Sequence, residues 1–231
     1  EDRTMDATTH TTTPDTTNYY LVHRALRRNA RRLASATQAY DRQDPRRTRA
    51  LVRWCSGFIA ELHCHHTIED DAFFPALVAR VPDAAELIVR TDADHASMDA
   101  IVARMEAGLA IVDAGGPANE LHEGARDLAD LLDDHLAFED AELIPLFEQH
   151  FTADEYQRLD AEAMEILGVS KQALYTVPFI VSEATPDEYA RMWVDAPLPF
   201  KAIYFACRGR FRRLADRALG PVDDRIPEVV R

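Results

Sequence analysis

The sequence predicts an all-α protein, namely an up-down-up-down four-helix bundle with additional C-terminal helices packed on it. Three observations predict this fold. Apolar residues recur at alternating steps of three and four along four long segments, which is the period of an amphipathic helix. Short breaks rich in Gly, Pro and Asp separate these segments, and short connections favour antiparallel neighbours. A polar motif also occurs twice along the chain, once in each half of the expected bundle.

Composition divides the chain into three parts. Residues 1–17 are rich in Thr and poor in apolar side chains, so we expect them to be disordered. Residues 18–151 hold the four amphipathic segments, with breaks near 41–44, 81–83 and 115–117. Residues 152–231 form a C-terminal helical extension, which the turn residues divide into several helices.

Individual residues indicate where these helices begin and end. Asn18 is a plausible cap for the first helix, and Asp44 followed by Pro45 begins the second. Pro75 should bend or loosen the second helix rather than end it, because the apolar spacing continues beyond it. In the extension, a capping box begins a helix at Thr152, and another helix begins at Thr185. We further expect a short helical piece at 170–175 and a last helix at 200–219.

The overall charge excludes some classes of function. The chain of 231 residues has a formal net charge of -14, whereas a nucleic-acid-binding protein needs a basic surface. We therefore expect no nucleic-acid partner. The sequence has neither an apolar run long enough to span a membrane nor a signal pattern, and its three cysteines form no Cys-x-x-Cys pair. These features favour a cytoplasmic protein with reduced cysteines and no membrane association.

The repeated motif places a histidine and a carboxylate on one helix face. His65 precedes Glu69 by four residues, and His135 precedes Glu139 by four residues. Positions i and i+4 lie one turn apart on the same face of an α-helix. Each copy continues with an Asp and, five residues further, a Pro. Two such helices facing each other would bring both pairs to one point, where they could hold a metal.

Two further histidines lie on the inward stripes of the first and third helices, His23 and His95. One inward histidine is usually a structural residue, but four in register with two glutamates favour a metal site. The candidate metal ligands are His23, His65, Glu69, His95, His135 and Glu139. Such imidazole-rich donors suit iron, manganese or zinc, and carboxylates on opposite helices could bridge two ions. The Glu-x-x-His motif of ferritin-type carboxylate sites does not occur in the sequence.

Other polar residues near the motif receive lesser roles. Asp70 and Asp140 follow the glutamates directly, so we expect them to accept hydrogen bonds from metal-bound imidazoles rather than bind metal. His63 and His66 are expected to turn outward on either side of His65. Asp99 lies at the margin of the third helix's inward stripe.

At these residues the sequence resembles the hemerythrin-like, or HHE cation-binding, family over about residues 19–151. The resemblance implies a non-haem di-iron centre bridged by oxygen and by Glu69 and Glu139, with the four histidines as terminal ligands. Oxygen-carrying members have a second His on the third helix, where this chain has Asp99, and they space the last carboxylate one residue further from its His. The resemblance therefore leaves a coordination position that is open or is filled by Asp99, Tyr19 or water.

The resulting hypothesis is a di-iron protein that reacts with or senses peroxide, O2 or NO, with a peroxidase- or catalase-like enzyme as one form of it. Zinc and manganese are the alternative metals. The alternative functions are a metal-dependent regulatory or binding module without turnover, and reversible O2 binding. The C-terminal helices could contact a protein partner or a second copy of the chain. The basic amphipathic last helix leaves open a role at a membrane surface.

Overall fold

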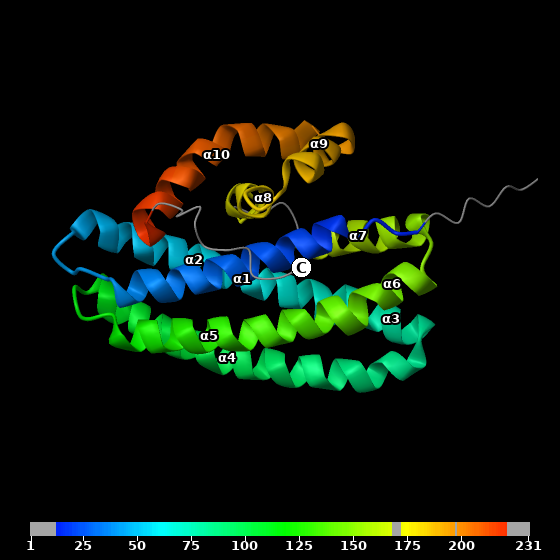
Figure 1. Cartoon of the computed structure of the whole chain (residues 1–231), viewed down its shortest axis with the longest axis horizontal. Helices are drawn as coiled ribbons and strands as arrows, with labels where there is room; N and C mark the ends of the chain where they lie inside the picture. The colour runs from blue at the N-terminus through cyan, green and yellow to red at the C-terminus, as the bar shows by residue number, and fades with distance from the viewer. Residues whose placement is uncertain (1–12, 168–171, 197, 221–231) are drawn as a thin grey trace, which may run out of the picture.

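The computed structural model describes residues 13–167, 172–196 and 198–220. Its centre is a bundle of four long helices: α1 (Thr17–Gln38), α2 (Pro45–Ile68), α4 (Ala85–Asp113) and α5 (Asn119–Phe138). The connections alternate between the two ends of the bundle, so that helices adjacent in the chain run antiparallel (Figure 1). The predicted fold class is therefore confirmed: the described residues form an up-down-up-down bundle with further helices packed on it.

Both motif helices contain a short π-helical segment that begins at the motif glutamate. These segments are η1 (Glu69–Phe73), which leads into α3 (Phe74–Arg80), and η3 (Glu139–Leu143), which leads into α6 (Ile144–His150). The backbone N–H of Phe74 donates to the carbonyl of Glu69, five residues earlier. Pro75 follows immediately, and the wider turn makes room for a ring that would clash in a regular α-helix. Pro75 thus loosens the helix without ending it, as the sequence predicts.

Individual residues explain how helices of the bundle begin and how closely two of them approach each other. The Asp44 side chain accepts hydrogen bonds from the backbone N–H groups of Arg46 and Arg47, which caps α2. A short 3-10 turn, η2 (Pro82–Ala84), precedes α4. A Cβ at Gly108 would lie 2.6 Å from the backbone nitrogen of Leu121. Glycine at this position therefore lets α4 and α5 pack backbone to backbone.

A polar layer separates two apolar clusters inside the bundle. The larger cluster fills the end nearer the α1–α2 connection and includes Trp54, Phe58 and Met105. The smaller one lies at the C-terminal ends of η1 and η3 and beyond them, and it includes Phe73 and Phe147. Between the clusters lie buried histidines and glutamates, which we call the histidine–glutamate layer: His23, His65, His66, Glu69, His95, His135 and Glu139. The layer is therefore closed off by hydrophobic packing along the bundle axis.

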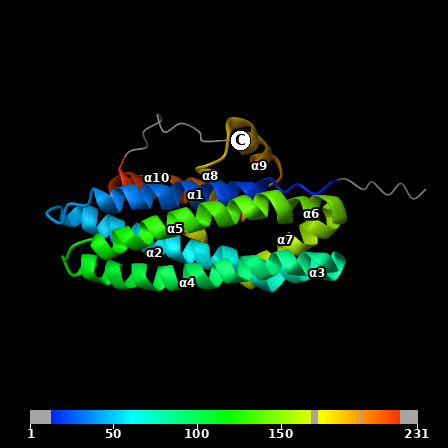
Figure 2. The same ribbon diagram turned by 60° about the horizontal axis from the view of Figure 1, so that its bottom comes forward.

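The C-terminal extension consists of α7 (Ala153–Leu167), α8 (Ala173–Val181), α9 (Pro186–Asp195) and α10 (Leu198–Leu219). Thr152 forms the predicted capping box with Glu155, and a helix begins after Thr185 as predicted, where Thr185 and Glu188 form a second capping box. α10 packs on α2 and on α8, and Figure 1 shows α8 nearly end-on between α10 and α1, while α9 lies on the outer side of the extension (Figures 1 and 2). The helix predicted at 170–175 is observed as α8, which reaches Val181; residues 168–171 lie outside the described residues.

The N-terminal segment predicted to be disordered is described only from residue 13. Thr16 is buried, and its hydroxyl donates a 2.6 Å hydrogen bond to the Glu148 carboxylate. Order therefore begins before α1, earlier than the composition suggests. Among the described residues, no helix is both long enough and apolar enough to cross a membrane.

Candidate metal centre

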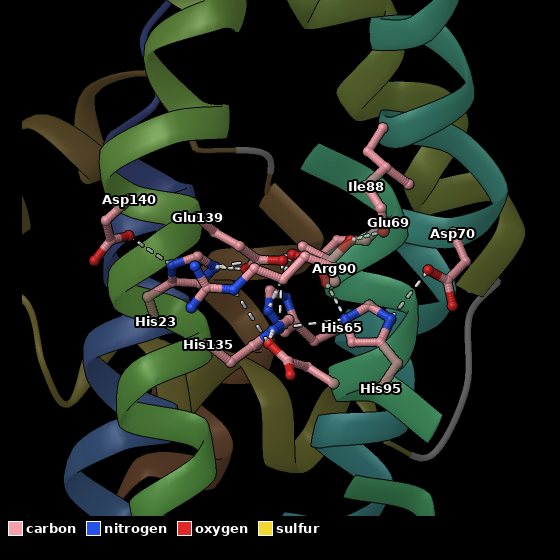
Figure 3. A network of polar contacts seen from close by, with 12 residues as sticks. His23, His65, Glu69, Asp70, Ile88, Arg90, His95, His135, Glu139 and Asp140 are labelled. Carbon is pink, nitrogen blue, oxygen red and sulfur yellow. Dashed lines mark hydrogen bonds and ion pairs between the residues drawn. The ribbon is translucent and has the colours of Figure 1, made fainter. Parts of the chain in front are cut away.

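The structure brings the six predicted ligands together in the buried layer (Figure 3). The π segments η1 and η3 supply the two glutamates, and each long helix supplies a histidine. The residues are His23 on α1, His65 on α2, Glu69 on η1, His95 on α4, His135 on α5 and Glu139 on η3. All six are buried, although they come from positions up to 116 residues apart.

Each glutamate divides its two oxygens between different histidines. Glu69 Oε1 lies 3.2 Å from His65 Nε2, and its Oε2 lies 3.5 Å from His95 Nε2. Glu139 Oε2 lies 3.5 Å from His23 Nε2, and its Oε1 lies 3.3 Å from His135 Nε2. This is the arrangement in which a carboxylate can bridge two cations, with one oxygen directed to each.

A fifth histidine belongs to the layer, contrary to the sequence prediction. His66 was expected to turn outward but is buried, and its ring stacks on that of His95 at 3.9 Å between centroids. The prediction was wrong because α2 lies between α1 and α4, so two adjacent positions both face inward. His65 faces the His23 ring, at 5.0 Å, whereas His66 faces α4. The spacing of three between His66 and Glu69 could have revealed this, since i and i+3 also share a face.

The donor atoms form two overlapping groups that share Glu69. His23, His65, Glu69 and Glu139 make the first group, and His66, Glu69, His95 and His135 make the second. Within each group the donor atoms lie within 4.8 Å of one another. The two groups differ in composition, because the first has two imidazoles and two carboxylates whereas the second has three imidazoles and one carboxylate. The two groups therefore offer a cation unlike surroundings.

Asp99 and Tyr19 were the other residues considered as ligands. Asp99 lies apart from the donor groups, whereas Tyr19 lies beside one of them. Asp99 is exposed, and its nearest ionic partner is His63, at 3.9 Å. It therefore contributes to neither group. Tyr19 is close: its hydroxyl donates a 2.7 Å hydrogen bond to Glu69 Oε1, and burial followed by the charge of Glu69 holds the phenol pKa well above its usual value. Tyr19 thus keeps a proton beside the first group.

Carboxylates outside the layer accept hydrogen bonds from two of the imidazoles, and a third carboxylate lies near another imidazole. Asp140 Oδ1 lies 2.7 Å from His23 Nδ1 and Asp70 Oδ1 lies 3.1 Å from His95 Nδ1, as Figure 3 shows. Asp94 Oδ2 lies 3.5 Å from His135 Nδ1. Asp70 and Asp140 therefore have the outer role that the sequence predicts. Because each accepts at Nδ1, it directs the Nε2 lone pair of its histidine toward the layer.

The buried donors fit metal ions better than they fit one another. Several of them have no hydrogen-bond partner among the described residues: His23 Nε2, His65 Nε2, His66 Nε2, Glu69 Oε2 and both Glu139 oxygens. Each such atom costs about 1–3 kcal/mol when it is buried without a partner, and a coordinated cation would remove this cost. Burial, reinforced by neighbouring imidazoles, lowers the pKa of His65, His66 and His135, so these rings are neutral and able to coordinate.

The fold and the site together define a helical-bundle protein whose interior can hold metal ions. Comparison with protein families agrees with this class, because the model of the hemerythrin HHE cation binding domain matches residues 16–147. The match spans more than half of the chain, and the protein belongs to this family. Searches of curated proteins and of solved structures returned no significant match.

Proposed function

We propose that this protein holds two iron ions in the histidine–glutamate layer and reacts with or senses a small oxidant, namely hydrogen peroxide, O2 or NO. The observation that carries the proposal is the pair of overlapping donor groups that share Glu69. The layer offers seven donor residues in all, two of them glutamates, and this number suits a dinuclear centre. Imidazole-rich donors without thiolates suit iron. When bound, iron supplies a Lewis acid and one-electron redox chemistry.

The residues of the chain would divide the work of holding and protecting such ions. His23 and His65 would hold the first ion, and His66, His95 and His135 would hold the second, with Glu69 and Glu139 shared. The first group has fewer nitrogen donors than the second. The Tyr19 hydroxyl donates its hydrogen bond to Glu69 Oε1, beside the first group. Tyr19 is therefore placed to donate a hydrogen bond beside the ion with the less saturated surroundings.

Three histidines of the layer keep a small solvent-exposed fraction. His65, His66 and His95 are 7%, 6% and 6% exposed, whereas His23, His135 and both glutamates are 0% exposed. Of these rings, His66 and His95 stack on each other where α2 faces α4. A small oxidant would reach the layer most directly at this pair.

Metal analysis after anaerobic reconstitution tests the proposal. We expect two irons per chain and an optical band from oxygen-to-iron charge transfer, with peroxide decay under turnover if the protein is an enzyme. Glu69→Ala should reduce the metal content and abolish turnover because Glu69 belongs to both groups. Asp99→Ala is the matched control and should leave both unchanged. A wild-type chain that binds no more than one iron would refute the dinuclear proposal.

A second candidate is a regulatory module without turnover, and one observation favours it. Glu61 is buried on α2, one turn before His65, and accepts hydrogen bonds from Gln172 at 3.1 Å and from Thr176. The C-terminal extension is thereby fastened to the helix that carries two histidines of the layer. In this case removal of metal should raise hydrogen exchange in α8, and Thr176→Val should produce the same rise with metal bound. Unchanged exchange in α8 on metal removal would argue against it.

A further inference from the structure

Three large apolar side chains are exposed at the junction of α9 and α10. Val194 is 73% exposed, Leu198 is 80% exposed and Phe205 is 56% exposed. Single exposed apolar residues are ordinary, but these three lie within twelve residues of one another and on the outermost helices of the molecule (Figures 1 and 2). This part of the surface is therefore more apolar than folding of the chain requires.

An aromatic cluster packs α9 against α10 and includes Phe205. Trp193 stacks on Phe205 at 5.5 Å between ring centroids and contacts Tyr204 at 4.9 Å and Phe200 at 5.7 Å. Tyr189, one turn before Trp193, contacts both Trp193 and Tyr204. α9 and α10 thus support each other through their own rings, and Phe205 is directed outward by a packed base.

The same surface of α10 is strongly basic. Leu198, Lys201, Phe205, Arg208 and Arg212 follow one another at steps of three and four, which places them on one helix face. The Arg208 guanidinium lies 4.9 Å over the Phe205 ring and 5.5 Å over Tyr204. Within Leu198–Leu219 six residues are basic and one is acidic, although the whole chain has a net charge of -14. This face of α10 therefore attracts anions, although the chain as a whole is negatively charged.

We propose that this face of α9 and α10 docks on an anionic lipid surface, with Val194, Leu198 and Phe205 entering the headgroup boundary and the arginines binding lipid phosphates. A helix with apolar and aromatic residues beside Arg and Lys is the type that lies in a membrane interface. This association does not depend on the proposed chemistry of the metal centre, and it differs from a membrane span.

The surface fits other occupants less well. A nucleic acid offers phosphates but no apolar medium for Leu198 and Val194. A two-fold contact between copies would bring the arginines of α10 against one another, and like charges in contact are unfavourable. The negative charge of the bundle also sets how the protein would be oriented on the membrane, because an anionic membrane would repel the bundle and attract α10. The metal centre would then stay on the aqueous side.

Sedimentation of the full-length, metal-loaded protein with lipid vesicles tests the proposal. We expect binding to vesicles of phosphatidylcholine with phosphatidylglycerol, little binding to phosphatidylcholine alone, and weaker binding at high salt. The double variant Arg208→Gln/Arg212→Gln should bind about thirtyfold more weakly, at about fivefold per arginine. The double variant Arg104→Gln/Arg126→Gln is the matched control on exposed arginines of α4 and α5 and should bind like wild type.

The apolar contribution is tested separately. Leu198→Asp should weaken binding, whereas Val89→Asp, at a site 68% exposed on α4, should not. Both sites are exposed, so both variants should keep the helical circular dichroism and metal content of wild type. Equal binding to neutral and anionic vesicles, or equal loss in Val89→Asp and Leu198→Asp, would overturn the proposal. Binding to an acidic protein without any binding to anionic vesicles would also overturn it.

Discussion

Replacing His66 with Leu should have opposite effects on the metal-free and metal-loaded protein. The Nε2 atom of His66 is buried without a hydrogen-bond partner among the described residues, and such burial costs about 1–3 kcal/mol in proteins. Leu has a similar size, and position 136, which corresponds to His66 in the second half of the chain, is already a buried Leu. The metal-free variant should therefore gain roughly 1–3 kcal/mol, or about 2–4 °C in melting temperature per kcal/mol for a chain of this length.

In the metal-loaded protein the same change removes one of three imidazoles from the second donor group. Loss of an outer partner of a ligand typically weakens metal binding about 10–100-fold, and loss of the ligand itself should cost more. We expect the variant to retain one ion per chain in the group of His23, His65, Glu69 and Glu139.

Calorimetric melting of the metal-free and metal-loaded forms, together with metal analysis, measures both effects. His122→Leu serves as the control, because His122 lies away from the layer and contacts the carbonyl oxygen of Ala34 at 3.1 Å. It should lower the stability of both forms by about 1 kcal/mol and leave the metal content unchanged. The reasoning is refuted if metal-free His66→Leu melts below wild type while the loaded variant still holds two ions.

Two further predictions concern the outer carboxylate and the packing of the extension. Asp140→Asn should weaken metal binding about 10–100-fold in chelator competition, because Asp140 orients His23, whereas an equal loss in exposed Asp99→Asn would contradict this role. Gly57→Ala should cost about 1–3 kcal/mol in urea unfolding, because its Cβ would lie 2.5 Å from the Tyr175 ring of α8. Gly209→Ala, where the added Cβ meets only an arginine tip at 3.5 Å, should instead raise stability by about 0.5–1 kcal/mol, and a loss there would show that the Gly57 effect is not steric.

The sequence predicted the bundle and six members of the layer because both depend on helical periodicity. An inward stripe of period 3.6 must be buried, and a His and a Glu on that stripe cannot be exposed without exposing the apolar residues around them. The duplication adds a second constraint, since both halves must place the pair at the same height. Helical periodicity did not predict the burial of His66, because this residue lies one position away from the inward stripe of α2. Its burial depends on α4 lying beside α2.

The extension shows where local reasoning reaches its limit. α8 is apolar on all sides and contains Pro178, so neither an amphipathic period nor helix propensity predicts its length. Its conformation is fixed by contacts distant in sequence: the Tyr175 ring packs on Phe211 of α10 at 5.2 Å and lies against Gly57 of α2. Tertiary contacts rather than helix propensity therefore determine the conformation of α8. A single sequence does not show which helix surfaces will be in contact.

The pKa of His66 supplies a test of its burial that uses pH. Burial, followed by the nearby His95 and His135 rings, holds the His66 pKa well below the value of about 6.5 expected in the unfolded chain. As pH falls below 6.5, the unfolded chain therefore takes up a proton at His66 that the folded metal-free protein does not. This uptake favours unfolding by about 1.4 kcal/mol per pH unit.

His66→Leu removes this contribution and leaves the other titrating groups in place. Some of these act in the opposite direction, such as Glu139, whose pKa is raised by burial and by Glu69, so the pH dependence of wild type alone mixes several effects. The difference between variant and wild type isolates His66. Between pH 6.5 and pH 5.5 the stability advantage of the metal-free variant should grow by about 1 kcal/mol in urea unfolding, because the unfolded imidazole is already half protonated at pH 6.5. An advantage that stays constant over this range would mean that His66 is protonated in the folded protein, and therefore that its ring reaches water rather than the metal layer.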